Sequence, residues 1–132
     1  MGEDIVLKSS GTQYYSYTYV ADAVAGLLTV LLCGKNGDAY NIADDRGDAM
    51  LKDLATVIAT LCNTKVIFAI PDAVEAAGYS TATKARLDGH KLKTLGWKPR
   101  YNIQSGIERT LNILKEINSS SQCNPKSATA TA

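Results

Sequence analysis

The sequence has few of the residues that mark metal or redox proteins. It contains a single histidine, His90, and three widely spaced cysteines, Cys33, Cys62 and Cys123. A lone histidine with no partner of metal-ligand type gives no zinc site, and scattered, odd-numbered thiols are typical of a reducing compartment. These absences predict a cytoplasmic protein without a metal site or a disulfide framework.

An excess of one charge and a long hydrophobic run are missing too. Fourteen basic against thirteen acidic residues give a net charge of +1, and the basic ones are scattered. Such a chain has no overall field for nucleic acid or anionic lipid. The longest apolar run, residues 20–33, is interrupted by Asp22 and is too short to span a bilayer. The first ten residues lack the features of a signal peptide. We therefore expect neither nucleic acid nor a membrane as a partner.

Familiar catalytic and cofactor motifs are also absent. There is no Gly-x-Gly-x-x-Gly or Walker loop, and none of the seven tyrosines is followed four residues later by lysine. One histidine does not support a Ser/His/Asp arrangement. Asp44 and Asp45 are adjacent, and such neighbouring loop carboxylates are usually solvated or capping. From its own residues, the chain has the pattern of a binding or structural domain.

The pattern of apolar residues alternates strands with helices, which predicts a single α/β domain over residues 1–118 and a disordered tail over 119–132. Helices are expected at 20–33, at about 49–62 with Asp48 as the cap, at 88–95 and at 103–117. Strands are expected at 5–8, within 38–44 and at 65–71, with a loop or irregular helix over 72–86.

Four tyrosines, Tyr14, Tyr15, Tyr17 and Tyr19, crowd into six residues before the first predicted helix. Three explanations are open: an aromatic surface for nucleic acid, ordinary packing, or an altered ligand-binding corner. The neutral net charge argues against the first. The alternation of tyrosine with Ser16 and Thr18 predicts an extended segment with one aromatic face.

Four stretches together resemble the C-terminal part of the extended short-chain dehydrogenase/reductase family, the NAD-dependent epimerases and dehydratases that act on nucleotide sugars. They are GTQYYSYTYVADAVAGLLTVL, GDAYNIAD, LKDLATVIA and RLDGHKLKTLGWKPRYNIQSGIERTL. Each is weak alone, but their order and spacing over residues 5–115 are specific. The resemblance implies a small mixed sheet with packed helices, which is the substrate-binding region, and the Rossmann half is absent. It also implies that NAD belongs to that half and that this chain carries no cofactor.

The resemblance implies four substrate-binding positions: Tyr15, Met50, Lys84 and Arg86. Tyr15 stands where the family has a phosphate-binding arginine, and losing that charge-assisted contact weakens diphosphate binding by about 1.5–3 kcal/mol. Met50 replaces a small polar residue that faces the nucleotide. Lys84 and Arg86 lie where another phosphate-binding arginine is common, and the alternative is that they are solvated loop residues. Trp97 is expected to pack the last helix against the sheet.

Two functions remain open at this stage. The first is the nucleotide-sugar-binding part of an NAD-dependent epimerase or dehydratase, with a nucleotide sugar and the missing Rossmann half as partners. No catalytic residue is present, so the chain alone is expected to be inactive. The second is a non-catalytic, truncated or degenerate module that binds another protein. In either case we expect an exposed apolar patch where the Rossmann half would lie, and a tendency to form homo-oligomers.

Overall fold

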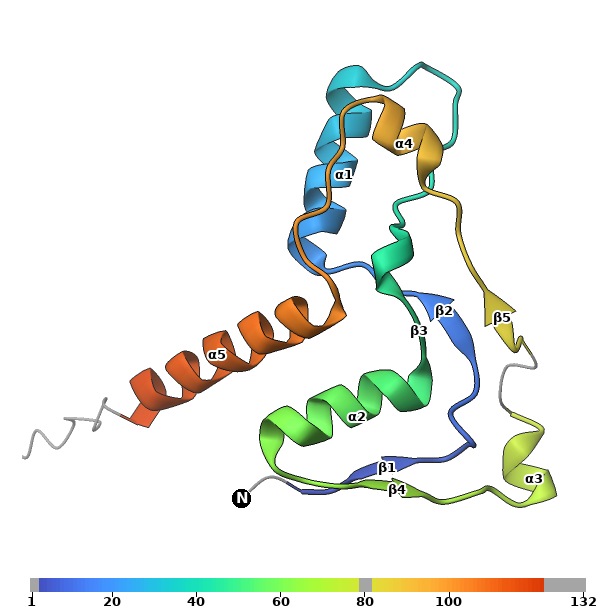
Figure 1. The fold of residues 1–132 in the computed structure, drawn as a ribbon, viewed down its shortest axis with the longest axis vertical. Coiled ribbons are helices and arrows are strands. Elements are labelled where there is room, and N and C mark those ends of the chain that lie inside the picture. Colours follow the sequence, from blue (N-terminus) through green and yellow to red (C-terminus); the bar gives the residue numbers. More distant parts are fainter. Residues whose placement is uncertain (1–2, 79–81, 123–132) are drawn as a thin grey trace, which may run out of the picture.

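The computed structural model describes residues 3–78 and 82–122, in which short strands alternate with helices (Figure 1). In chain order the elements are β1 (Ile5–Leu7), β2 (Tyr14–Ser16), α1 (Val20–Cys33), η1 (Asp45–Gly47), β3 (Asp48–Met50), α2 (Leu51–Cys62), β4 (Val66–Phe68), α3 (Ala73–Ala76), β5 (Lys84–Ala85), α4 (His90–Thr94) and α5 (Ile103–Gln122). This order confirms the α/β class.

The strands form two small sheets. β1 pairs with β4 in parallel, whereas β2 lies between an antiparallel neighbour, β3, and a parallel neighbour, β5. Helix α2 runs from the end of β3 to the start of β4 and packs on β1, β3 and β4, so it joins the two sheets. The three-stranded sheet is therefore mixed, as expected, and the two-stranded sheet is parallel.

Helix α1 packs on the rest of the chain through its small and polar side. Asp22 and Gly26 are its buried residues. The Asp22 carboxylate accepts hydrogen bonds from the backbone N–H groups of Arg100 (3.0 Å) and Tyr101 (2.9 Å). One side chain thus fixes the start of α1 to the segment that leads into α5.

The sequence predicts that Trp97 packs the last helix against the sheet, and this prediction is wrong. Trp97 is 3% exposed, and its ring nitrogen donates to the backbone oxygen of Asp22 at 3.0 Å. A side chain at Gly26 would lie 3.3 Å from both the Trp97 ring nitrogen and Leu92. Trp97 therefore fills the space that Gly26 leaves open and packs α1 against α4.

The strand predicted within residues 38–44 is wrong, because none is present there. Ala43 and Asp44 are buried, but no neighbouring strand among the described residues pairs with the segment. An apolar, strand-like sequence forms a strand only when a partner supplies the other half of the ladder. The pattern was correct for the burial of Ala43 and Asp44 but not for that of Asp38, Ala39 and Asn41, nor for the pairing of the segment.

Three predicted helices have different boundaries. Helix α4 covers His90–Thr94 instead of residues 88–95. Helix α2 begins at Leu51, and Asp48 is not its cap, because Asp48 lies in β3 opposite Ser16. Helix α5 continues past the predicted end at Ile117 to Gln122. The first residues of the predicted tail are therefore helical, and its remainder, residues 123–132, lies outside the described residues.

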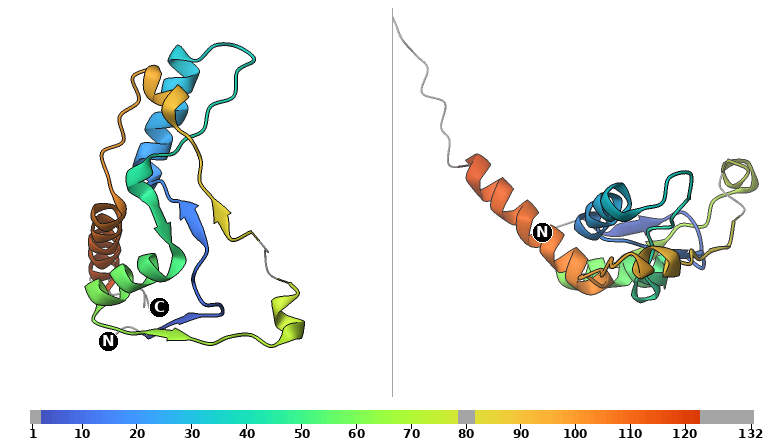
Figure 2. Two further views of the ribbon diagram at one scale, coloured as in Figure 1. Left: turned by 45° about the vertical axis from the view of Figure 1, so that its right-hand side comes forward. Right: turned by 90° about the horizontal axis from the view of Figure 1, so that it is seen from above.

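Part of the apolar surface of the described residues is uncovered. Large apolar side chains are exposed along α1 and at Ile70, Val74 and Leu114. That the Rossmann half would cover an apolar patch of this chain stays a prediction. Helix α5 projects away from the sheets, as Figure 2 shows. Among the described residues, no helix is long and apolar enough to cross a membrane.

Candidate functional site

Three of the four predicted site residues gather on one face of the sheet β3-β2-β5. Tyr14 lies opposite Met50 on β3 and opposite Lys84 on β5. Residues paired in register point to the same face of a sheet. Arg86 follows β5, and its Nε donates to the carboxylate of Asp48, which pairs with Ser16 on this same face. Residues Tyr14, Met50, Lys84 and Arg86 therefore form what we call the polar sheet face.

Tyr15 lies on the other side of the sheet. Its register partners are Ala49 and Ala85, and neighbouring residues of a strand point to opposite faces. Its ring lies edge-on to that of Tyr17, with 6.4 Å between the ring centres, and its hydroxyl donates to the backbone oxygen of Ala82 at 2.9 Å. Burial, and then the nearby Tyr15 phenol, raise the pKa of Tyr17. The predicted role of Tyr15 stays a prediction.

Tyr14 is the residue that sequence reasoning missed. The family pattern drew attention to Tyr15, whereas the register puts Tyr14 between Met50 and Lys84. The alternation of the tyrosines indicated two different faces, but it could not say which face the basic residues would share.

Asp48 holds Arg86 in place. The Asp48 side chain is 4% exposed. Its carboxylate accepts hydrogen bonds from both Ser16 Oγ and Arg86 Nε. The hydrogen bond to Asp48 raises the pKa of the Arg86 guanidinium. Arginine is charged in proteins in any case. Among the described residues, no acceptor meets the two terminal nitrogens of Arg86. Arg86 is thus positioned through one nitrogen, and its other donors remain available.

Arg86 also lines a polar cavity of about 450 Å³ next to the sheet face. The range for small-molecule sites is about 300–1,000 Å³, so the cavity is large enough to hold part of a nucleotide. Its lining residues are Ala43, Asp45, Arg86, Leu87, Asp88, Gly89, His90 and Lys93. A second, apolar hollow of about 230 Å³ lies between α2 and α5 and is below that range.

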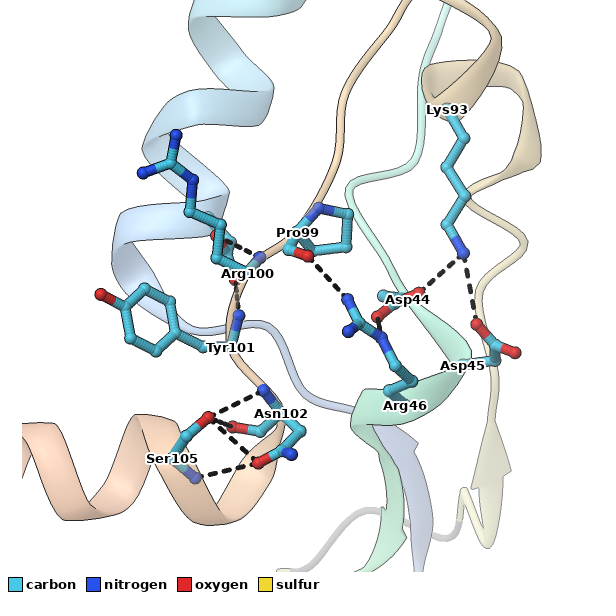
Figure 3. Close-up of polar contacts among 10 residues, drawn as sticks. Asp44, Asp45, Arg46, Lys93, Pro99, Arg100, Tyr101, Asn102 and Ser105 are labelled. Carbon is cyan, nitrogen blue, oxygen red and sulfur yellow. Dashed lines mark hydrogen bonds and ion pairs between the residues drawn. The ribbon is translucent and has the colours of Figure 1, made fainter.

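A network of ion pairs, drawn in Figure 3, contributes Asp45 and Lys93 to the lining of this cavity. Lys93 Nζ lies 2.7 Å from Asp44 and 3.2 Å from Asp45, and Arg46 bridges Asp44 (2.6 Å) to the backbone oxygen of Pro99 (2.7 Å). The hydrogen bond with Asp44 raises the pKa of Lys93, and the hydrogen bond with Lys93 lowers that of Asp45. Lys93 is therefore committed to these two carboxylates.

Lys84 contrasts with Lys93. It is exposed, and within the described part of the chain its ammonium meets no hydrogen-bond or ion-pair partner. The Lys84 ammonium and the terminal nitrogens of Arg86 are therefore two cationic donors on the polar sheet face. Such a pair of donors suits a diphosphate.

No three His, Cys, Asp or Glu side chains of residues 3–78 and 82–122 cluster as metal ligands. Strand β3 runs directly into α2 through Met50 and Leu51, so the glycine-rich turn that seats a dinucleotide pyrophosphate is missing at this junction.

No family model matches the chain, but individual relatives do. It is 26% identical to human dTDP-D-glucose 4,6-dehydratase over 112 residues, which cover 83% of this chain and 32% of the relative. The fold matches dTDP-glucose 4,6-dehydratase from Bacillus anthracis in complex with NAD, with a TM-score of 0.73 and 17% identity over 89% of this chain and 36% of that one. It also matches UDP-glucuronic acid 4-epimerase from Bacillus cereus in complex with UDP-glucuronic acid and NAD, with a TM-score of 0.68 and 20% identity over 85% and 35% of the two chains.

Over about 85% of its length the chain is homologous to nucleotide-sugar dehydratases and epimerases of the extended short-chain dehydrogenase/reductase type. It spans about a third of the length of the relatives it matches.

Proposed function

We propose that this chain is the substrate-binding, C-terminal part of an NAD-dependent nucleotide-sugar dehydratase or epimerase and that it contacts the diphosphate of the sugar nucleotide. The convergence of Met50, Lys84 and Arg86 on the polar sheet face, beside a cavity of suitable size, supports this proposal. Lys84 and the terminal nitrogens of Arg86 would hold the phosphates, and Tyr14 lies between them and Met50.

The chain alone would carry out no chemistry. The Tyr-x-x-x-Lys pair is absent from its sequence, and the strand-to-helix junction at Met50 offers no cradle for NAD. NAD, which would oxidise a sugar hydroxyl, belongs in this proposal to the two thirds of the longer enzymes that this chain does not match.

Nucleotide binding tests the proposal. Titration calorimetry with UDP-glucose and dTDP-glucose is expected to detect weak binding to the wild-type chain. Lys84→Met or Arg86→Met is expected to weaken it by about tenfold or more, because a charge-assisted hydrogen bond contributes about 1.5–3 kcal/mol. Lys98→Met, an exposed lysine outside the site, is the control.

If neither UDP-glucose nor dTDP-glucose binds to the folded wild-type chain, the proposal is contradicted. This outcome would favour the second candidate, a non-catalytic interaction module. Two observations favour that alternative. The buried carboxylate of Asp48 already neutralises Arg86. Tyr15, in place of an arginine, supplies no charge.

A further inference from the structure

The outer part of helix α5, residues 112–120, is exposed on all sides. Each of its side chains is exposed, and the helix projects away from the sheets (Figure 1). We infer that this part pairs with α5 of a second copy of the chain, antiparallel, with the two Asn112 residues at the same level. No residue of the polar sheet face lies on α5, so the inference goes beyond the proposed function and is independent of it.

The outer part of α5 lacks the packing that normally keeps a helix formed. Helices shorter than about 12–15 residues are marginal in water, and most helical stability in proteins comes from packing of an apolar side. The sequence does not compensate, because the helix ends with Ser119, Ser120 and Ser121 before Gln122, and serine forms helices less well than alanine or leucine. The outer part therefore needs a partner along its apolar side.

Apolar residues form one stripe along α5, from its packed start to its outer part. At spacings of three and four residues, they are Ile103, Ile107, Leu111, Leu114 and Ile117. Near the start of the helix, the stripe and the facing side of α2 line the apolar hollow of about 230 Å³. Farther out, Leu114 is 50% and Ile117 is 54% exposed. The chain thus carries both an open apolar hollow and uncovered side chains that suit one.

The antiparallel arrangement brings these two features together. Ile107, which lines the hollow, lies five residues before Asn112, and Ile117 lies five residues after it. Ile117 of the second copy therefore falls opposite Ile107 and fills the hollow. By the same count, Leu114 of the second copy falls opposite Thr110, which also lines the hollow. Two-fold symmetry repeats the contact and closes the assembly at two copies, whereas a parallel pair would set the two hollows side by side and fill neither.

The charges of α5 suit a second copy as the partner. Glu108 and Lys115 lie on one side of the apolar stripe, about two turns apart. Arg109 and Glu116 lie on its other side, at the same separation and with the signs reversed. In the antiparallel pair, each acid lies near the level of the base on the same side of the second copy. Opposite charges then lie beside each other along both sides of the contact, which favours self-pairing.

Sedimentation of the full chain tests the pairing. Every sample carries Leu31→Glu, so that association through the uncovered side of α1 is suppressed. Leu114→Glu should weaken the remaining association by at least about tenfold, because an apolar side chain leaves the contact and a charge enters it. The matched control Asn112→Glu puts the same charge on the opposite side of the same exposed helix and should leave association unchanged. Circular dichroism checks that both variants keep their helices.

Distances between spin labels test the direction of the pair. With Cys33, Cys62 and Cys123 changed to serine, one label is attached at Asn112→Cys or at Ser119→Cys, both on the polar side of the helix. In the antiparallel pair, the two labels at 112 lie at the same level. Those at 119 lie about 21 Å apart along the axis, because a helix rises 1.5 Å per residue. We therefore expect a clearly longer distance for the label at 119 than for the label at 112.

Three outcomes would overturn the inference. One is a strict monomer at high concentration, and another is a Leu114→Glu chain that associates as strongly as its Asn112→Glu control. The third is an equal label distance at 112 and 119, which is the result for a parallel pair. Nucleotide binding enters none of these measurements, so a failure of the proposed function leaves their results unchanged.

Discussion

At the scale of single residues, Asp22 contributes most to the arrangement of the helices. Its buried carboxylate accepts two backbone N–H groups, and its backbone oxygen accepts the Trp97 ring nitrogen. Asp22→Ala should lower the free energy of unfolding by about 3 kcal/mol, since two amides would lose a charged acceptor. Chemical denaturation measures this, with Glu116→Ala, at an exposed carboxylate on α5, as the control. An equal effect of the two changes would contradict the role given to Asp22.

Asp45 gives a dependence of stability on pH. Its hydrogen bond with Lys93 lowers its pKa in the folded chain below the ordinary value of 3.8. A carboxyl group with a lowered folded pKa stabilises the fold above the ordinary value, and this contribution is lost as the pH falls through the folded pKa. Asp45→Asn should therefore be less stable than the wild type at pH 6, and the difference should shrink below about pH 4. Urea unfolding at several pH values measures it; a difference that grows toward acid would show that the sign is wrong.

The sequence indicated individual site residues better than it indicated their geometry. The family pattern singled out Met50, Lys84 and Arg86, and the structure brings these three residues to one face of the sheet. Their role in binding stays a prediction. The placement of Tyr14 on their face could not be predicted, because strand register depends on which chain segments pair. The position of Trp97 beside Gly26 likewise depends on a contact between distant segments.

At the scale of elements, helix α5 begins with a reciprocal cap. The side-chain oxygen of Asn102 accepts from the backbone N–H of Ser105 at 2.9 Å, and Ser105 Oγ accepts from the backbone N–H of Asn102 at 3.1 Å (Figure 3). Asn102→Ala should cost about 1 kcal/mol of stability, whereas Asn102→Asp, an equally good cap, should cost little. Thermal unfolding of the two variants measures the difference, and equal melting temperatures would rule out the cap.

Helices were the elements most accessible from sequence. The 3.6-residue pattern of α1 gave both of its ends, because Gly34 and a polar turn follow it. The strand expected within 38–44 could not be predicted correctly, since a strand needs a paired neighbour and no described strand supplies one there. The start of α2 was misplaced because Asp48 has the residue type of a cap, but its carboxylate is bound by Ser16 and Arg86 instead.

At the scale of the whole molecule, the uncovered side of α1 should make the isolated chain associate with itself. Sedimentation should show concentration-dependent association, and Leu31→Glu should weaken it by about tenfold or more, because one buried leucine side chain contributes about 1.5–3 kcal/mol. Val74→Glu places the same charge on α3, away from α1, and should leave association unchanged. A strict monomer at high concentration would contradict this prediction.

The uncovered helix side also affects how much of the chain a cell would keep. Chaperones and proteases act on proteins that display apolar surface and open strand edges, and small differences in free energy change abundance several-fold. With six large aliphatic side chains of α1 open to water, a copy in which this helix side stays uncovered would be degraded quickly. Its steady-state level would then follow how fully that side is covered rather than its rate of synthesis.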